Sequence, residues 1–152
     1  MRYTARIVLM GSLLAAAACG GDSTTGPGTT GAMSATIDGA HWTSSLGASA
    51  THSNGAFAVG GSNNDFTMAI GFADTGVGTY DIGQLSPTNA ILNQQGGAAW
   101  VANVTGGSGS VTVTSVSATR ITGTFNFTAI PLPNSGATGN RTITNGTFDI
   151  TF

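Results

Sequence analysis

The sequence contains no lysine and no glutamate, and its 152 residues include only four arginines and six aspartates. Two of the arginines lie within the first six residues, so Arg120 and Arg141 are the only ones beyond them. Two cations cannot neutralise a run of phosphates, which argues against nucleic-acid binding and against a basic membrane-binding face. The lack of glutamate also argues against the carboxylate pair of a glycoside hydrolase, because the aspartates fall mostly in turns or on polar faces.

Cysteine and histidine are nearly as scarce. Cys19 is the only cysteine, which excludes a disulfide within the chain and a thiolate metal cluster. His41 and His52 are the only histidines, too few for a zinc site, and we expect no cofactor. Asn63–Asp65 and Asp74-Thr75 offer oxygen ligands for calcium, but these residue types are more simply explained as turn formers.

Residues 1–18 have the composition of a secretory signal peptide. A positively charged start is followed by an apolar run of about 12 residues, whereas a membrane-spanning helix needs about 20. The run ends at Ala16-Ala17-Ala18, directly before Cys19 and Gly20. We therefore expect this segment to be cleaved and the protein to leave the cytoplasm.

The residues around Cys19 resemble the lipobox of bacterial lipoproteins, in which a small-residue triplet precedes a cysteine that is lipidated and becomes the new N-terminus. The resemblance implies two or three acyl chains on Cys19, and more than one chain holds a protein firmly on a membrane. In bacterial lipoproteins an aspartate directly after the cysteine is a signal for retention in the inner membrane. This chain has Gly20 at that position, so the resemblance implies that the protein is anchored in the outer membrane. The alternative is an ordinary secretory signal with a cysteine near its cleavage site. Residues 19–31 would combine the lipidated cysteine with a flexible linker rich in Gly, Thr and Ser.

Residues 32–152 are predicted to form a single β-rich domain. Apolar residues alternate with small or hydroxyl residues, as in 66–73 and 121–128, and no window has helical spacing. Asp38-Gly39 is a strong signal for a two-residue hairpin turn. We predict an antiparallel β-sandwich or partly closed barrel of nine or ten strands, one or two of the candidate ranges being doubtful. The candidate strands are 32–38, 41–44, 46–53, 56–61, 65–73, 78–83, 89–93, 98–105, 109–117, 120–130 and 141–152.

A short internal echo lies near the end of the chain. The sequence of 121–125 is similar to that of 143–148, which carries one additional residue. This pattern predicts a C-terminal hairpin of two antiparallel strands, with a β-bulge at the insertion.

Several short motifs together resemble a family of small, uncharacterised all-β bacterial lipoproteins, over most of residues 33–152. The family has no assigned activity, so the resemblance implies fold and location but no mechanism. The motifs are 35–39 with Trp42, then 78–80, 107–110, 121–125 and 143–148.

Three hypotheses for function remain open. The first is a non-enzymatic, lipid-anchored domain of the cell envelope that binds an envelope protein or has a structural role. The second is a glycan-binding module in which Trp42, Tyr80 and Trp100 stack on sugar rings, although such residues more often fill a core. The third is a hydrolase that uses His41 or His52 with a serine and an aspartate, and it lacks a Gly-x-Ser-x-Gly motif.

Overall fold

The computed structural model describes residues 31–152 of the chain. The predicted signal peptide, the predicted lipidation site at Cys19 and nearly all of the predicted linker lie outside the described residues. Within 31–152 the secondary structure is entirely β, and no helix of membrane-spanning length and hydropathy is present there.

Eleven strands lie in the described part of the chain, so the predicted number of nine or ten is too low. Each of the eleven candidate ranges, the doubtful ones included, contains a strand. Most bounds agree within one residue. The prediction of 98–105 is too long, because a tight turn between Asn103 and Gly106 ends that strand at Ala102. The strands are β1 Gly31–Ile37, β2 Ala40–Thr43, β3 Gly47–Ser53, β4 Ala56–Ser62, β5 Phe66–Ala73, β6 Gly78–Ile82, β7 Asn89–Gln94, β8 Ala99–Ala102, β9 Ser108–Val116, β10 Arg120–Pro131 and β11 Arg141–Thr151.

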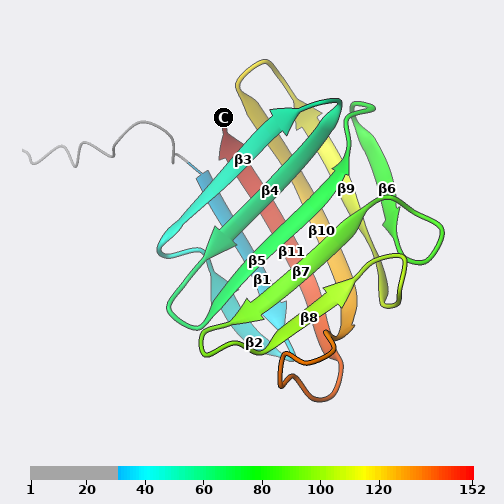
Figure 1. Cartoon of the computed structure of the whole chain (residues 1–152). Helices are drawn as coiled ribbons and strands as arrows, with labels where there is room; N and C mark the ends of the chain where they lie inside the picture. The colour runs from blue at the N-terminus through cyan, green and yellow to red at the C-terminus, as the bar shows by residue number, and fades with distance from the viewer. Residues whose placement is uncertain (1–30) are drawn as a thin grey trace, which may run out of the picture.

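The strands form one curled antiparallel sheet that folds over on itself into a half-barrel, which confirms the predicted fold class. Figure 1 shows a front layer of β3, β4, β5, β7 and β8 crossing a rear layer of β1, β2, β11, β10, β9 and β6. Strand β10 joins the layers, because it pairs with β9 over 121–128 and with β8 at Ile130 and Pro131. Among the strands, β6 pairs only with β9, and a single bridge from Ile82 to Thr88 links its end to the residue before β7. The rest of that edge of β6 has no strand partner and forms a seam with the front layer.

Turn chemistry sets the register of the hairpins. Asp38 and Gly39 have positive φ angles of 47° and 88°, as a two-residue turn between paired Ile37 and Ala40 requires. The predicted β-bulge is also present in β11. Phe125 pairs with Gly146 and Phe127 with Ile143, so β11 has one residue more than β10 in this interval.

The apolar side of each strand faces the space between the two layers and fills it. The core includes the predicted inward residues of β5, β9, β10 and β11, and the hydroxyl residues of the rear layer lie on the outer face. The largest fully buried side chains are Trp100, Met33, Met68, Ile70, Leu92, Ile121, Ile143, Ile150, Val59, Val111 and Val113.

The internal echo has a packing explanation. Gly123 of β10 pairs with Phe148 of β11, and Phe125 of β10 pairs with Gly146 of β11. A Cβ atom at Gly123 would lie 2.4 Å from the Phe148 ring, and one at Gly146 would lie 2.4 Å from the Phe125 ring. Each aromatic ring therefore covers the glycine of the opposite strand, so the Gly-Thr-Phe motif is needed once in each strand.

Candidate functional site

Two hollows in the half-barrel contain the candidate residues. The seam cleft lies between β6, the end of β5, the start of β9 and the β6–β7 loop of residues 83–88, and has a volume of about 730 Å³. The Trp42 hollow lies where the β1–β2 turn, the β4–β5 turn and the first residue of β11 meet, and has a volume of about 280 Å³. They are formed by different segments and share no lining residue.

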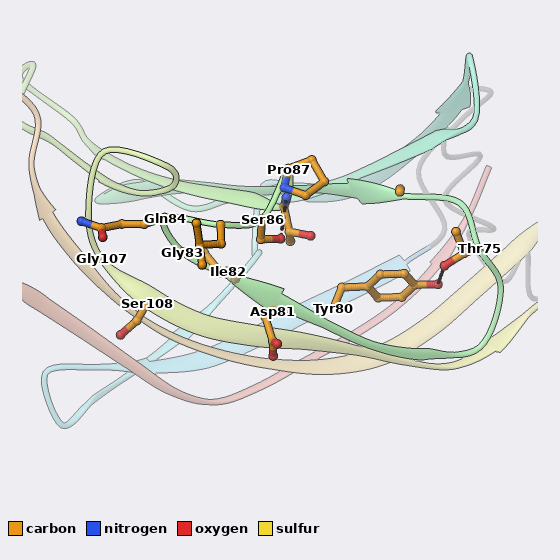
Figure 2. Close-up of a pocket in the computed structure, with 13 residues that line it drawn as sticks. Thr75, Tyr80, Asp81, Ile82, Gly83, Gln84, Ser86, Pro87, Gly107 and Ser108 are labelled. Atoms are coloured by element: carbon orange, nitrogen blue, oxygen red, sulfur yellow. Dashed lines mark hydrogen bonds between the residues drawn. The ribbon is translucent and has the colours of Figure 1, made fainter.

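The wall of the seam cleft is mainly apolar. Figure 2 shows Tyr80 lying in the space between the layers with its hydroxyl toward Thr75, whereas Asp81 points away from that space. The Tyr80 hydroxyl donates to the Gly76 carbonyl and accepts from the Thr75 hydroxyl at 3.0 Å, so the ring is held from the β5–β6 loop. Leu85, at the rim, is fully exposed. The cleft thus offers an aromatic ring and aliphatic side chains to a ligand.

Aromatic rings extend from Tyr80 across the neighbouring end of the half-barrel. The Phe72 ring lies 5.4 Å from the Tyr80 ring, and the Phe57 ring stacks on His52 with centroids 4.3 Å apart. His52 Nε2 lies 2.7 Å from Asp74 Oδ2, and both groups are partly exposed. These contacts join the β3–β4 hairpin to the β5–β6 loop and stiffen one side of the seam.

Two residues that line the Trp42 hollow carry a fully buried donor atom without an acceptor. Trp42 is 3% exposed, and its indole Nε1–H has no hydrogen-bond partner in the described structure. The same holds for Nε–H of Arg141, which also lines this hollow. A buried donor without a partner lowers the stability of the folded state by about 1–3 kcal/mol. Such donors are rare in native proteins. By contrast, Nε1–H of Trp100 donates to the Gly139 carbonyl at 2.8 Å.

Arg141 is fixed from two sides. Its NH1 group donates to Asp38 Oδ2 at 2.7 Å, and its guanidinium lies 4.5 Å from the centre of the Trp100 ring. Asp38 Oδ1 also accepts the backbone N–H of Thr142 at 2.8 Å. Burial raises the pKa of Asp38, but the Thr142 N–H and the Arg141 guanidinium together outweigh it and hold the pKa below its usual value. The ionised Asp38 carboxylate therefore links the β1–β2 turn to the start of β11 through Arg141 and Thr142.

The remaining wall of the Trp42 hollow is polar on one side and apolar on the other. His41 and Asp65 are exposed at its edge, and no hydrogen bond to their side chains is found among the described residues. Asn63 Oδ1 accepts the N–H groups of Asp65 and Phe66 at 2.9 and 2.8 Å, which shapes the β4–β5 turn. The half-buried Phe66 ring supplies an apolar surface.

The structure does not bring the three predicted stacking rings together. Trp42 and Trp100 are 3% and 2% exposed, and both belong to the hydrophobic core. Tyr80 lies in the seam cleft, apart from the Trp42 hollow. The expectation of a single platform of exposed rings is therefore wrong for the two tryptophans, because the curled sheet turns their strands' apolar face inward.

The histidines and the proposed calcium ligands also lie apart. His41 and His52 are in different hairpins, and no serine hydroxyl hydrogen-bonds to either ring within residues 31–152. Asn63–Asp65 and Asp74-Thr75 lie at opposite ends of β5. Within the same residues, no three His, Cys, Asp or Glu side chains come together as metal ligands do.

Two features of the candidate sites have no local sequence signal. Asp38 and Arg141 are 103 positions apart, and only the strand order β2-β1-β11 places them together. The seam cleft depends on β6 having no strand partner on the side of the front layer. Only the composition gives a hint of the ion pair. Because Arg120 and Arg141 are the only cationic side chains beyond residue 6, each is expected to pair with one of the few aspartates.

The chain was compared with protein families, curated proteins and solved structures. No curated protein and no solved structure matches it. A family described as a domain of unknown function, DUF6252, matches residues 29–150, which cover all of the half-barrel except the last residue of β11. The sequence resemblance to an uncharacterised family is thereby confirmed, while its lipoprotein character stays a prediction. The protein is a member of the DUF6252 family.

Proposed function

We propose that this protein is a lipid-anchored, non-enzymatic binding module of the bacterial outer membrane, which holds a small neutral ligand with apolar surface in the seam cleft. The observation that carries the proposal is the cleft itself. Its volume of about 730 Å³ falls within the ~300–1,000 Å³ of typical small-molecule sites. Tyr80, Leu85 and Pro87 give it apolar contact surface.

The charge distribution supports a neutral ligand. Asp81 is the only ionisable acid or base among the cleft residues besides the Tyr80 phenol, and it points away from the space between the layers. Both arginines of the half-barrel are paired elsewhere, Arg120 with Asp149 and Arg141 with Asp38. No cation is therefore at hand in the cleft for a phosphate or a carboxylate ligand.

The non-enzymatic part of the proposal is supported by the arrangement of the polar groups. The hydroxyls of Thr75 and Tyr80 are occupied with each other and with the Gly76 carbonyl. Ser86 Oγ accepts the N–H of Thr88 at 3.1 Å. These groups shape the loops, and none forms a nucleophile–base pair.

Binding is tested with N-phenylnaphthylamine, a neutral apolar fluorophore, and the full chain carrying Cys19→Ser. We expect saturable binding that Leu85→Asp reduces at least about tenfold, because it replaces an apolar side chain of the cleft with a charge. Leu46→Asp is the matched control: Leu46 is also an exposed leucine but does not line the cleft. Equal fluorescence titrations for both variants, or no saturable binding at all, would contradict the proposal.

The anchor is tested separately by metabolic labelling with palmitate. The wild-type chain is expected to incorporate label and to fractionate with outer membranes, whereas Cys19→Ser is expected to do neither. Equal labelling of the two chains would refute lipidation at Cys19. The result is independent of ligand binding, because Cys19 precedes the half-barrel.

A further inference from the structure

We propose that the ligand of the seam cleft is an uncharged apolar molecule that bears a hydroxyl group, and that Thr88 recognises this group. The inference rests on the proposed function and names the chemical class of its ligand. It starts from Thr88, which lines the cleft, is 2% exposed and is the only buried polar residue within 31–152. Its side chain lies on the inner face of the sheet, because Ala90 and Leu92 follow at a spacing of two and are buried in the core.

The side-chain hydroxyl of Thr88 has no partner of its own. The backbone N–H of Thr88 donates to Ser86 Oγ at 3.1 Å, but no hydrogen bond to Thr88 Oγ1 is found in the described part of the chain. The unpaired side-chain atoms that are sealed from solvent there belong to Trp42 and Arg141, and Thr88 Oγ1 is not among them. The Thr88 hydroxyl is therefore open to the cleft whose wall it helps to form. A buried hydroxyl normally has a partner, so the structure points to an oxygen supplied by the ligand.

Ser86 supplies a second hydroxyl from the same loop. Its Oγ accepts the Thr88 N–H, while its own proton has no acceptor among residues 31–152. Ser86 is half-buried and lines the cleft, and Figure 2 shows it on the β6–β7 loop with Tyr80 extending from β6. A hydroxyl group has one donor and two acceptor positions. A ligand hydroxyl can therefore accept from one of these side chains and donate to the other.

The rest of the wall suits an apolar skeleton without charge. The Tyr80 hydroxyl is already occupied by Thr75 and by the Gly76 carbonyl, so Tyr80 offers a ligand the surface of its ring. Pro87 adds a further apolar side chain. Asp81 points away from the space between the layers, and a charged ligand would lie there without a counter-ion. Phenols and apolar alcohols share the required chemistry, an uncharged hydroxyl on an apolar skeleton.

The buried position of Thr88 makes the hydroxyl a basis for selectivity. A ligand without a hydrogen-bonding group covers the cleft and leaves the Thr88 hydroxyl unpaired and shut off from water. A site of this kind binds a ligand that carries the hydroxyl better than an analogue of the same shape that lacks it. The preference should disappear when the Thr88 hydroxyl is removed.

Displacement of N-phenylnaphthylamine from the full chain carrying Cys19→Ser measures this preference. The competitors are 2-naphthol and 2-methylnaphthalene, which differ only in a hydroxyl against a methyl group. In Thr88→Val, which keeps the shape of the side chain, we expect 2-naphthol to bind about fivefold more weakly, as for the loss of one hydrogen bond between uncharged groups. We expect 2-methylnaphthalene to bind at least as tightly as before. Each inhibition constant is corrected for the affinity of the fluorophore for the same variant.

Two further variants serve as controls. Thr88→Ser keeps the hydroxyl and is expected to retain the preference for 2-naphthol. Thr51→Val removes the hydroxyl of an exposed threonine of β3 that does not line the cleft, and is expected to bind both competitors like the parent. The saturated decahydro-2-naphthol distinguishes the sources: tighter binding than 2-naphthol indicates an apolar alcohol, and weaker binding a phenol.

A second measurement needs no variant at Thr88 and therefore does not depend on whether Thr88→Val folds. In the parent chain, bound 2-naphthol is expected to give intermolecular nuclear Overhauser effects to the Thr88 methyl group. If these effects are absent while 2-naphthol is bound, the proposed recognition is wrong.

The displacement results separate this inference from the proposed function. If Thr88→Val changes the binding of 2-naphthol and 2-methylnaphthalene equally, Thr88 does not recognise the hydroxyl and the inference is overturned. The proposed function survives that result, because it requires only saturable fluorophore binding that Leu85→Asp weakens. If the fluorophore does not bind at all, both are wrong.

Discussion

The reciprocal Gly–Phe packing between β10 and β11 predicts a large effect from a single methyl group. In Gly123→Ala the new Cβ would lie 2.4 Å from Cζ of Phe148 and 2.3 Å from the carbonyl oxygen of Thr112. The ring is buried in the core and the oxygen belongs to the backbone of β9, so neither can move away freely. We expect a loss of about 3 kcal/mol in the free energy of unfolding, the upper end of the usual cost of overpacking. Gly146→Ala should behave alike.

Gly78→Ala is the matched control. Gly78 also lies in a β-strand and has a φ angle that alanine tolerates, but a Cβ there would meet no atom within 4 Å. Replacing such a glycine stabilises a protein by about 0.4–1 kcal/mol through the unfolded chain. Urea unfolding followed by circular dichroism measures both variants. For Gly123→Ala we expect the thermal midpoint to fall by roughly 10–15 °C. If Gly123→Ala unfolds like Gly78→Ala, the packing explanation of the internal echo is wrong.

Two further predictions concern the Trp42 end. Because the pKa of Asp38 is lowered on folding, its ionised form stabilises the protein fully above the unfolded value of about 3.9, and this contribution is lost as the pH falls through the folded value. Urea midpoints should therefore show Asp38→Asn less stable than wild type at pH 7, and the difference should shrink as the pH falls below about 3.9; a difference that does not change with pH would contradict this role of Asp38. Trp100→Phe should cost about 1 kcal/mol more than Trp42→Phe, since only Trp100 loses a hydrogen bond; equal unfolding free energies would mean that Trp42 Nε1–H has an acceptor in solution.

The sequence was informative about every local feature of the fold. Alternation of apolar and hydroxyl residues located the strands, since the two faces of a strand differ in solvent contact. Asp38-Gly39 marked a hairpin because few residues other than glycine, asparagine and aspartate adopt positive φ angles. The extra residue of 143–148, compared with 121–125, predicted the β-bulge. The observed bulge lies in the same interval, between the pairs Phe125–Gly146 and Phe127–Ile143.

The sites were less predictable, because they depend on which strands become neighbours. Trp42 and Trp100 were considered as exposed sugar platforms, and the curl of the sheet buries both. The contact of Arg141 with Asp38 needs β1 beside β11, an order that no local pattern specifies. The seam cleft likewise exists because β9 is the only strand that pairs with β6, which follows from the global topology and not from the composition of 78–82.

The pairing of Gly31 with Ile150 has a consequence for how the molecule faces its surroundings. The first residue of β1 lies beside the C-terminal end of β11. From there β1 extends about 20 Å to the turn at Asp38. Any attachment made through the preceding segment would hold the half-barrel by the end opposite to Trp42. The Trp42 hollow would then lie at the far end of the half-barrel from the point of attachment.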